Sequence, residues 1–191
     1  MNKKMLQIDK VNWADTFPFC PETSVELSNN HETLFLTFRV KGEQVRAVTT
    51  EDQGPVWEDS CVEFFCRVPG EKRYFNFETN CIGAMVASHR VSRGEDIVRL
   101  TPEEMSRIRR HCTYPREAVE ASSPCDWEVS LEIPLSLIFR NRQPVFPQPL
   151  EANFYKCGDK TPQPHYVSWQ PIPLPKPDFH RPEFFGEIML E

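Results

Sequence analysis

The chain has 191 residues, a formal net charge of −6 and a pI near 5.5. Nucleic-acid-binding proteins usually carry a basic stripe, so this charge balance argues against a nucleic-acid partner. No stretch approaches the roughly 20 apolar residues of a membrane span. The start, MNKKMLQIDK, has no apolar run behind its lysines, which a signal peptide would need. We therefore expect a cytoplasmic protein as given, or a secreted or periplasmic one if a signal was trimmed.

Cysteine and proline usage narrows the class further. The seven cysteines include no CxxC pair, so the usual spacing of a structural zinc site is absent. We expect reduced and mostly buried thiols, as is usual for free cysteines. Ten of the 18 prolines lie between Pro144 and Pro182, which predicts stiff, extended loops in the C-terminal part.

Alternation of apolar and polar residues dominates the chain and predicts half-buried strands of antiparallel sheets. It is clearest in Leu34–Val40 and in Trp127–Ile133. In chain order, the predicted strands are Leu34–Val40, Ala47–Thr49, Cys61–Val68, Tyr74–Asn80, Ala84–His89, Trp127–Ile133, Ala152–Cys157 and Glu187–Leu190.

Only one segment has strong helix signals. Thr101 offers an N-cap, followed by a proline and a capping-box glutamate. Met105, Ile108 and Cys112 would then mark the apolar face of this helix, and a further helical turn is expected at Leu135–Ile138. Many short strands with few helices predict an all-β antiparallel sandwich, which we expect to form a single domain over residues 1–191.

The hairpin predicted from Cys61–Val68 and Tyr74–Asn80 carries an unusual set of polar residues. Period-2 alternation puts Glu63 on one face of the first strand and Glu78 on one face of the second. A four-residue turn at Pro69–Lys72, centred near Gly70 and Glu71, pairs these two carboxylates directly. Opposed carboxylates repel unless a cation, a shared proton or the hydroxyl groups of a ligand compensate. The alternative is that a shifted register or solvent separates them.

Aromatic residues accompany these polar groups. Trp57 stands at the mouth of the polar face, and an indole beside carboxylates and amides suits a sugar ring, which packs on the indole and hydrogen-bonds the polar groups. Trp169 follows Tyr166 and precedes a stiff proline-rich run, which makes it a second candidate platform. The alternatives are that Trp57 lies in the core or at its rim and that Trp169 plugs one end of the sandwich. Residues 178–186 are interpreted as a closing loop held by charge pairs.

At this point the chain resembles a known family. Val56–Phe65 is similar to the W-x-D-x-V-E-x-F signature of carbohydrate-binding module family 9 and its bacterial relatives. The Tyr74–Asn80, Trp127–Leu135 and Tyr166–Trp169 segments follow in the expected order. The resemblance extends from about Phe17 to Leu190.

The resemblance implies an immunoglobulin-like β-sandwich that grips the end of a sugar chain between two tryptophans. Carried over by position, the sugar-binding residues would be Trp57, Glu63, Asn80, a residue at or near Tyr166, and Trp169. Glu78 stands where the family has a basic residue, so the hydrogen-bond donors of this site differ. The family also implies a structural calcium ion and, as partner, a glycoside hydrolase of the xylan-degrading, polysaccharide-utilising kind. The ligand that we expect for this chain is a mono- or oligosaccharide, with no cofactor required.

We expect a non-catalytic carbohydrate-binding domain, and two other functions remain open. The first is a glycoside hydrolase that uses Glu63 and Glu78, because opposed carboxylates can reach the spacing of about 5 Å of a retaining pair. The second, from fold analogy with DOMON-type domains alone, is haem binding through Met85 with His165 or His180.

Overall fold

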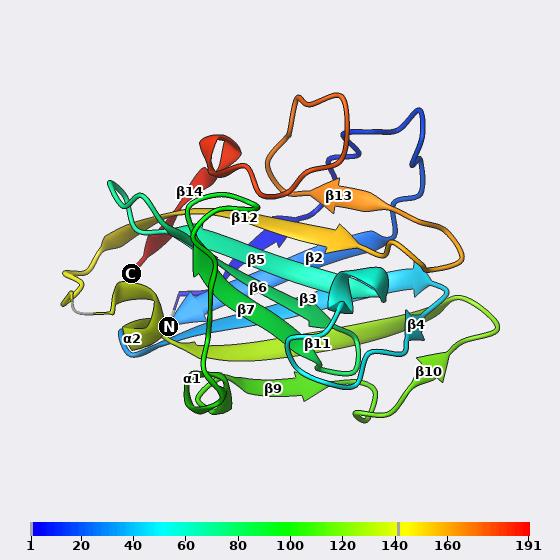
Figure 1. Cartoon of the computed structure of the whole chain (residues 1–191), viewed down its shortest axis with the longest axis horizontal. Helices are drawn as coiled ribbons and strands as arrows, with labels where there is room; N and C mark the ends of the chain where they lie inside the picture. The colour runs from blue at the N-terminus through cyan, green and yellow to red at the C-terminus, as the bar shows by residue number, and fades with distance from the viewer. Residues whose placement is uncertain (1, 141) are drawn as a thin grey trace.

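The computed structural model describes residues 2–140 and 142–191. Two antiparallel sheets lie face to face, and long loops from both ends of the chain cover the outer face of one of them (Figure 1). The predicted all-β sandwich is therefore confirmed. None of the described helices is long and apolar enough to cross a membrane.

The first sheet has five strands and contains the clearest alternation of the sequence. In spatial order its strands are β1 (Lys4–Gln7), β2 (Glu22–Asn29), β3 (Thr33–Glu43), β11 (Cys125–Pro134) and β9 (Arg109–Cys112). The two predicted strands β3 and β11 pair at the centre, with Leu36 opposite Leu131. Strands β1 and β2 were not predicted, because polar residues occupy most of their positions and leave little alternation to detect.

The second sheet has seven strands and carries the polar hairpin. Its strands are β13 (Tyr166–Ser168), β12 (Gln148–Cys157), β5 (Cys61–Arg67), β6 (Tyr74–Asn80), β7 (Met85–Arg90) and β8 (Val98–Arg99), with β14 (Gly186–Leu190) also paired to β12. The predicted hairpin forms, with β5 and β6 antiparallel and adjacent. Both long neighbours of this hairpin, β12 and β7, were also predicted as strands.

Helices and small elements are few. They are the helices α1 (Pro102–Ser106) and α2 (Leu135–Phe139), the 3₁₀ turns η1 (Val56–Glu58) and η2 (Pro182–Phe184), and the short pair β4 (Arg46–Ala47) and β10 (Val119–Glu120). The capping box forms as predicted: Thr101 Oγ1 accepts from the Glu104 amide, and a Glu104 carboxylate oxygen accepts from the Thr101 amide. The predicted turn of helix after Pro134 also forms.

The expected length of the first helix was wrong. The helix ends at Ser106, although the sequence predicted an apolar face that continued to Cys112. Ile108 is still buried, but Arg109–Cys112 forms β9 and pairs with β11. Backbone hydrogen bonds to an exposed edge of the first sheet therefore override the local helical signal.

Apolar residues between the two sheets form the main core. Phe64 of β5 stacks between Phe77 and Phe154, with ring centroids 6.0 Å and 5.1 Å away. All three rings are fully buried, and each contributes roughly 1.5–3 kcal/mol through the hydrophobic effect. This layer fixes which face of each strand of the second sheet points inward, and it leaves the alternate residues on the outer face.

A second, smaller core lies on that outer face. Tyr155 of β12 stacks on Phe179 with ring centroids 4.2 Å apart, and Trp13 packs on the same phenylalanine. The indole N–H of Trp13 donates to the carbonyl of Leu174 at 2.7 Å, which ties the N-terminal segment to the proline-rich C-terminal loop. These two segments thus cover part of the sheet and leave the rest of its outer face open.

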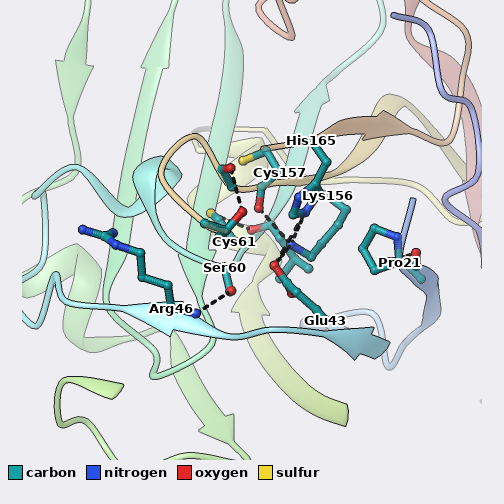
Figure 2. A network of polar contacts seen from close by, with 12 residues as sticks. Pro21, Glu43, Arg46, Ser60, Cys61, Lys156, Cys157 and His165 are labelled. Atoms are coloured by element: carbon teal, nitrogen blue, oxygen red, sulfur yellow. Dashed lines mark hydrogen bonds and ion pairs between the residues drawn. The ribbon is translucent and has the colours of Figure 1, made fainter. Parts of the chain in front are cut away.

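A charged network is enclosed between the sheets (Figure 2). The ammonium of Lys156 donates to Glu43 Oε1 at 3.0 Å and to the carbonyl of Cys157 at 2.8 Å, and it lies 2.7 Å from His165 Nε2. The other carboxylate oxygen of Glu43 accepts from the indole N–H of Trp127. Glu43 and Trp127 belong to the first sheet and Lys156 to the second, so this network links the two layers.

Replacing Lys156 by methionine tests how much the fold depends on this link. The variant keeps the apolar stem but leaves Glu43 buried without its cation, which should cost about 3–5 kcal/mol of unfolding free energy. Lys160→Met is the control, because its ion pair with Glu58 is exposed and should contribute less than about 1 kcal/mol. Chemical denaturation measures both, and equal small losses would contradict a structural role for the network.

Candidate functional site

A pocket of about 370 Å³ opens on the outer face of the second sheet. Strands β5, β6, β7 and β12 supply its floor, and η1 and loops supply its walls. The residues that line it are Trp57, Glu63, Glu78, Val86, Arg90, Arg93, Ile97, Arg99, Cys157, Asp159, Tyr166, Pro177, Asp178, Phe179 and His180. Its size is within the range of pockets that bind small molecules.

Two opposed carboxyl groups lie on the floor. Glu63 of β5 pairs directly with Glu78 of β6, which confirms the predicted register. The apolar neighbours of both residues face the inner core, so alternation leaves the two carboxyl groups no other side. Both side chains are almost completely buried. The repulsion expected for such a pair must therefore be relieved locally.

Protonation relieves it. Burial raises the pKa of Glu63 well above its usual range, and the nearby acidic groups of Cys157 and Glu78 raise it further. The Cys157 thiol donates to Glu63 Oε1 at 3.1 Å. Glu63 is therefore held as a neutral acid, able both to donate and to accept a hydrogen bond.

Glu78 keeps part of its charge through a chain of polar side chains. The side-chain amide of Asn76 donates to Glu78 Oε1 at 2.9 Å, and its oxygen, Asn76 Oδ1, accepts from the Ser88 hydroxyl at 2.6 Å. The guanidinium of Arg90 donates in turn to Ser88 Oγ. Burial raises the pKa of Glu78 to about 7, although Arg90 and the Asn76 amide act in the opposite direction. Near neutral pH this carboxyl can take up or release a proton.

One wall of the pocket is held by backbone contacts between two loops. The amide of Asp159 donates to the Trp57 carbonyl at 3.1 Å, and the amide of Lys160 donates to the Glu58 carbonyl at 2.9 Å. These bonds fix the backbone at Trp57, whose side chain is 37% exposed and lines the pocket together with Asp159. Burial raises the pKa of Asp159 as well.

The opposite wall comes from the C-terminal loop. The Tyr74 hydroxyl lies 2.8 Å from His180 Nδ1, and burial lowers the pKa of this imidazole to about 3, so the ring is neutral. Asp178 pairs with Arg181 at 2.7 Å and lies 3.6 Å from Arg93. The predicted closing loop with charge pairs is confirmed, and its residues Phe179 and His180 also face the pocket.

Four of the six predicted site residues meet in this pocket: Trp57, Glu63, Glu78 and Tyr166. Asn80 lies at the end of β6 and has a structural environment instead. Its amide nitrogen donates to Asp59 at 2.9 Å and to the carbonyl of Thr49, while its oxygen accepts from the amide of Ala84. With these bonds satisfied and its side chain fully buried, Asn80 supports the turn after β6 rather than the pocket wall.

Trp169 also lies away from the pocket lining. Tyr166 pairs with Cys157 across β13 and β12, and both face the pocket. Trp169 is three residues further along, so alternation turns it to the inner side. There it packs on Phe154, with ring centroids 5.8 Å apart, at the edge of the main core. The structure thus does not bring Trp57 and Trp169 together.

Several pocket residues could not be recognised as site residues from the sequence. Arg90 reads as the polar end of a strand, and Asp159 as part of an ordinary Gly-Asp turn. Cys157 enters the site only because β12 pairs with β5, which places it directly opposite Cys61. A prediction of that strand pairing would have brought Cys157 beside Glu63.

The geometry disfavours the proposed haem ligands. Both ring nitrogens of His165 are engaged, one by Lys156 and the other by the carbonyl of Gln163. Met85 is buried in the main core, whereas His180 lies on the outer face of the sheet. These residues do not form a pair of axial ligands.

The calcium ion implied by the resemblance stays a prediction. Within residues 2–140 and 142–191, a single group of three His, Cys, Asp or Glu side chains converges closely enough to hold a metal: Cys61, Glu63 and Cys157. Calcium requires six to eight hard oxygen ligands, which two thiols do not supply.

Comparisons with known proteins agree with the sandwich fold. The family model described as "Carbohydrate-binding family 9" matches residues 1–190. The solved structure of a "putative carbohydrate-binding protein" from Bacteroides uniformis ATCC 8492 is 37% identical, with a TM-score of 0.91 over 98% of this chain and 86% of that one. No curated protein matches the chain.

Two more distant structures share the fold. Both are family 9 carbohydrate-binding modules from Caldicellulosiruptor kristjanssonii. The complex with glucose is 9% identical, with a TM-score of 0.61 over 98% of this chain and 84% of that chain. The complex with cellotriose is 11% identical, with a TM-score of 0.59 over 100% of this chain and 82% of that chain.

The pKa of Glu78 predicts how stability changes with pH. The unfolded carboxyl loses its proton near pH 4.5 and the folded one near pH 7, so the folded state binds more protons between these values. This contribution to stability is complete below about pH 4.5 and is lost as the pH rises through about 7.

Glu78→Gln removes that contribution. Only the wild type then loses this stability as the pH rises. The unfolding free energy of the variant minus that of the wild type should therefore increase by roughly 2–3 kcal/mol from about pH 4.5 to about pH 8. Denaturant titrations of both proteins across this range measure the difference, in which the histidine contributions cancel. Glu128→Gln, which alters an exposed carboxyl on β11, is the control. A constant difference between Glu78→Gln and the wild type would contradict the assigned titration.

Proposed function

The chain belongs to carbohydrate-binding family 9, and we propose that it binds the end of a carbohydrate in the pocket that contains Trp57, Glu63 and Glu78. The observation that carries the proposal is the combination of an exposed indole with buried, hydrogen-bonding acids in one concave site. A sugar ring offers an apolar C–H face and a rim of hydroxyl groups, and this site offers a partner for each.

Aromatic rings support the binding of a ring-shaped ligand. Trp57, Tyr166 and Phe179 all line the pocket. Since Trp169 packs on Phe154, we assign the aromatic surface that accompanies Trp57 in this site to Tyr166 and Phe179. A pocket of about 370 Å³ accommodates roughly one or two sugar rings, which favours a chain end over the middle of a polymer.

The polar floor supports recognition of hydroxyl groups. A neutral Glu63 donates and accepts, while Arg90 and Asp159 add a donor and an acceptor at the sides. Sites of this kind discriminate strongly, because a ligand without the matching hydroxyl leaves buried polar groups unpaired. The two distant structures hold glucose and cellotriose, so glucose and cello-oligosaccharides are the first ligands to test.

Trp57→Ala is the direct test of this site. Loss of the stacked indole should weaken binding of the best ligand more than about tenfold, because the ligand loses apolar contact. Isothermal titration calorimetry against glucose, cello- and xylo-oligosaccharides, with and without calcium, measures the effect. The fold should be unchanged, since this side chain is 37% exposed.

Trp169→Phe is the matched control. It keeps an aromatic ring against Phe154, and we expect the affinity to remain within about twofold of the wild type. An equal loss in Trp57→Ala and Trp169→Phe would favour the two-tryptophan clamp instead. Unchanged affinity in Trp57→Ala would place the sugar elsewhere on the molecule.

A glycoside hydrolase activity is a second candidate, because burial raises the pKa of both Glu63 and Glu78. A carboxyl that titrates near pH 7 suits a general acid. A retaining mechanism also needs an ionised nucleophile, and the environment of Glu63 opposes its ionisation. A panel of aryl glycosides, assayed from about pH 5 to about pH 9, separates the two functions: turnover abolished in Glu78→Gln would establish the enzyme.

A further inference from the structure

Three potential metal ligands converge under the pocket. Cys61 and Glu63 are two residues apart on β5 and so face the same side, and Cys157 of β12 pairs directly with Cys61. The two sulfur atoms and a carboxylate oxygen of Glu63 all lie within 4.8 Å of one another, and all three side chains are buried. Figure 2 shows the two cysteines as neighbours beside Lys156.

Among the described residues, no cationic side chain forms a hydrogen bond or an ion pair with these three groups. The ammonium of Lys156 lies on the inner side of the sheet, where Glu43 and His165 engage it. A divalent ion that displaces the protons of the two thiols and of the Glu63 carboxyl would supply the positive charge that these enclosed acids lack.

We propose that Cys61, Glu63 and Cys157 bind a divalent transition-metal ion of the zinc class, with one coordination position open to the pocket. Two thiolates and a carboxylate are an accepted donor set for zinc and exclude calcium or magnesium. Tetrahedral zinc with bonds of about 2.0–2.3 Å separates its ligand atoms by roughly 3.3–3.8 Å. The convergence within 4.8 Å, with 3.1 Å from Cys157 Sγ to Glu63, allows this with small side-chain movements.

The pocket provides both the entry path and the open position. Glu63 and Cys157 line the pocket, while Cys61 lies behind them in the smaller core. An ion can therefore enter from solvent and retain a water molecule, or a ligand hydroxyl, on its exposed side. Each of the two thiols and the Glu63 carboxyl gives up one proton to solvent when it binds the ion, and no oxidant or reductant is involved. This site stands whether or not the pocket binds a sugar.

Cobalt(II) is the probe, because tetrahedral thiolate coordination gives it visible d–d bands and a near-ultraviolet thiolate-to-metal charge-transfer band. The full chain, kept reduced with a phosphine and handled without metal, should develop both bands with one equivalent of cobalt. One equivalent of zinc should then bleach them. Absence of the charge-transfer band with the protein folded would overturn the proposal.

Matched cysteine variants locate the site. Cys61→Ser and Cys157→Ser should each weaken cobalt binding at least about tenfold and reduce the charge-transfer intensity by about half. Cys66→Ser is the control: it makes the same change on the same strand, in a buried cysteine that faces the main core. Bands of undiminished intensity and affinity in both site variants, or an equal loss in Cys66→Ser, would place the metal elsewhere.

Glu63→Gln keeps the test valid if a serine variant fails to fold. It retains both thiols, so the charge-transfer band should persist with weaker affinity. Thermal unfolding adds an independent readout, since the same zinc concentration should raise the Tm of the wild type and of Cys66→Ser more than that of the site variants. A Tm that zinc leaves unchanged in the wild type would contradict a folded-state site.

Discussion

The buried ammonium of Lys156 sets the arrangement on which the rest of the structure depends. Its three hydrogen-bonding positions are satisfied by Glu43, His165 and its neighbour's carbonyl, and its side chain is fully enclosed. A buried cation is tolerated only when its hydrogen bonds are complete. A shift of β12 by one residue would turn Lys156 away from Glu43 and His165, and it is therefore strongly disfavoured. With Lys156 fixed inward, Cys157 must face outward, and it therefore lies on the floor of the pocket.

The same network shapes the pocket wall. His165 accepts from Lys156, and burial lowers its pKa well below its usual range, so the ring is neutral and its Nδ1–H donates to the carbonyl of Gln163. This bond braces the loop between β12 and β13 one residue before Tyr166. Asp159, in the same loop, is bonded to the Trp57 backbone. The aromatic and acidic walls of the pocket thus depend on a charge that lies on the other side of the sheet.

Local patterns predicted the hairpin well and long-range pairing poorly. The register of Glu63 and Glu78 followed from a four-residue turn and strict alternation, both of which are readable within about 20 residues. Trp169 was expected at the site both from the stiff proline-rich run that follows it and from the resemblance. Three positions separate it from Tyr166, an odd number that alternation assigns to opposite faces. The helix extended to Cys112 failed because β9 finds its partner in β11. Neither Lys156 nor Cys157 could be given a role until the neighbours of β12 were known.

The acidic groups of the pocket floor are unusual because they lie close together and are buried from solvent. Glu63 and Cys157 keep protons, and a protonated carboxyl presents to a ligand hydroxyl both a donor and an acceptor. The same two groups become anionic ligands once a metal ion replaces the protons. Glu63 therefore belongs to both proposed sites. In its protonated form it hydrogen-bonds a sugar hydroxyl, and in its deprotonated form it binds the metal ion. Binding of a metal ion would consequently change the affinity for a sugar, and binding of a sugar the affinity for the metal ion, through this single carboxyl group.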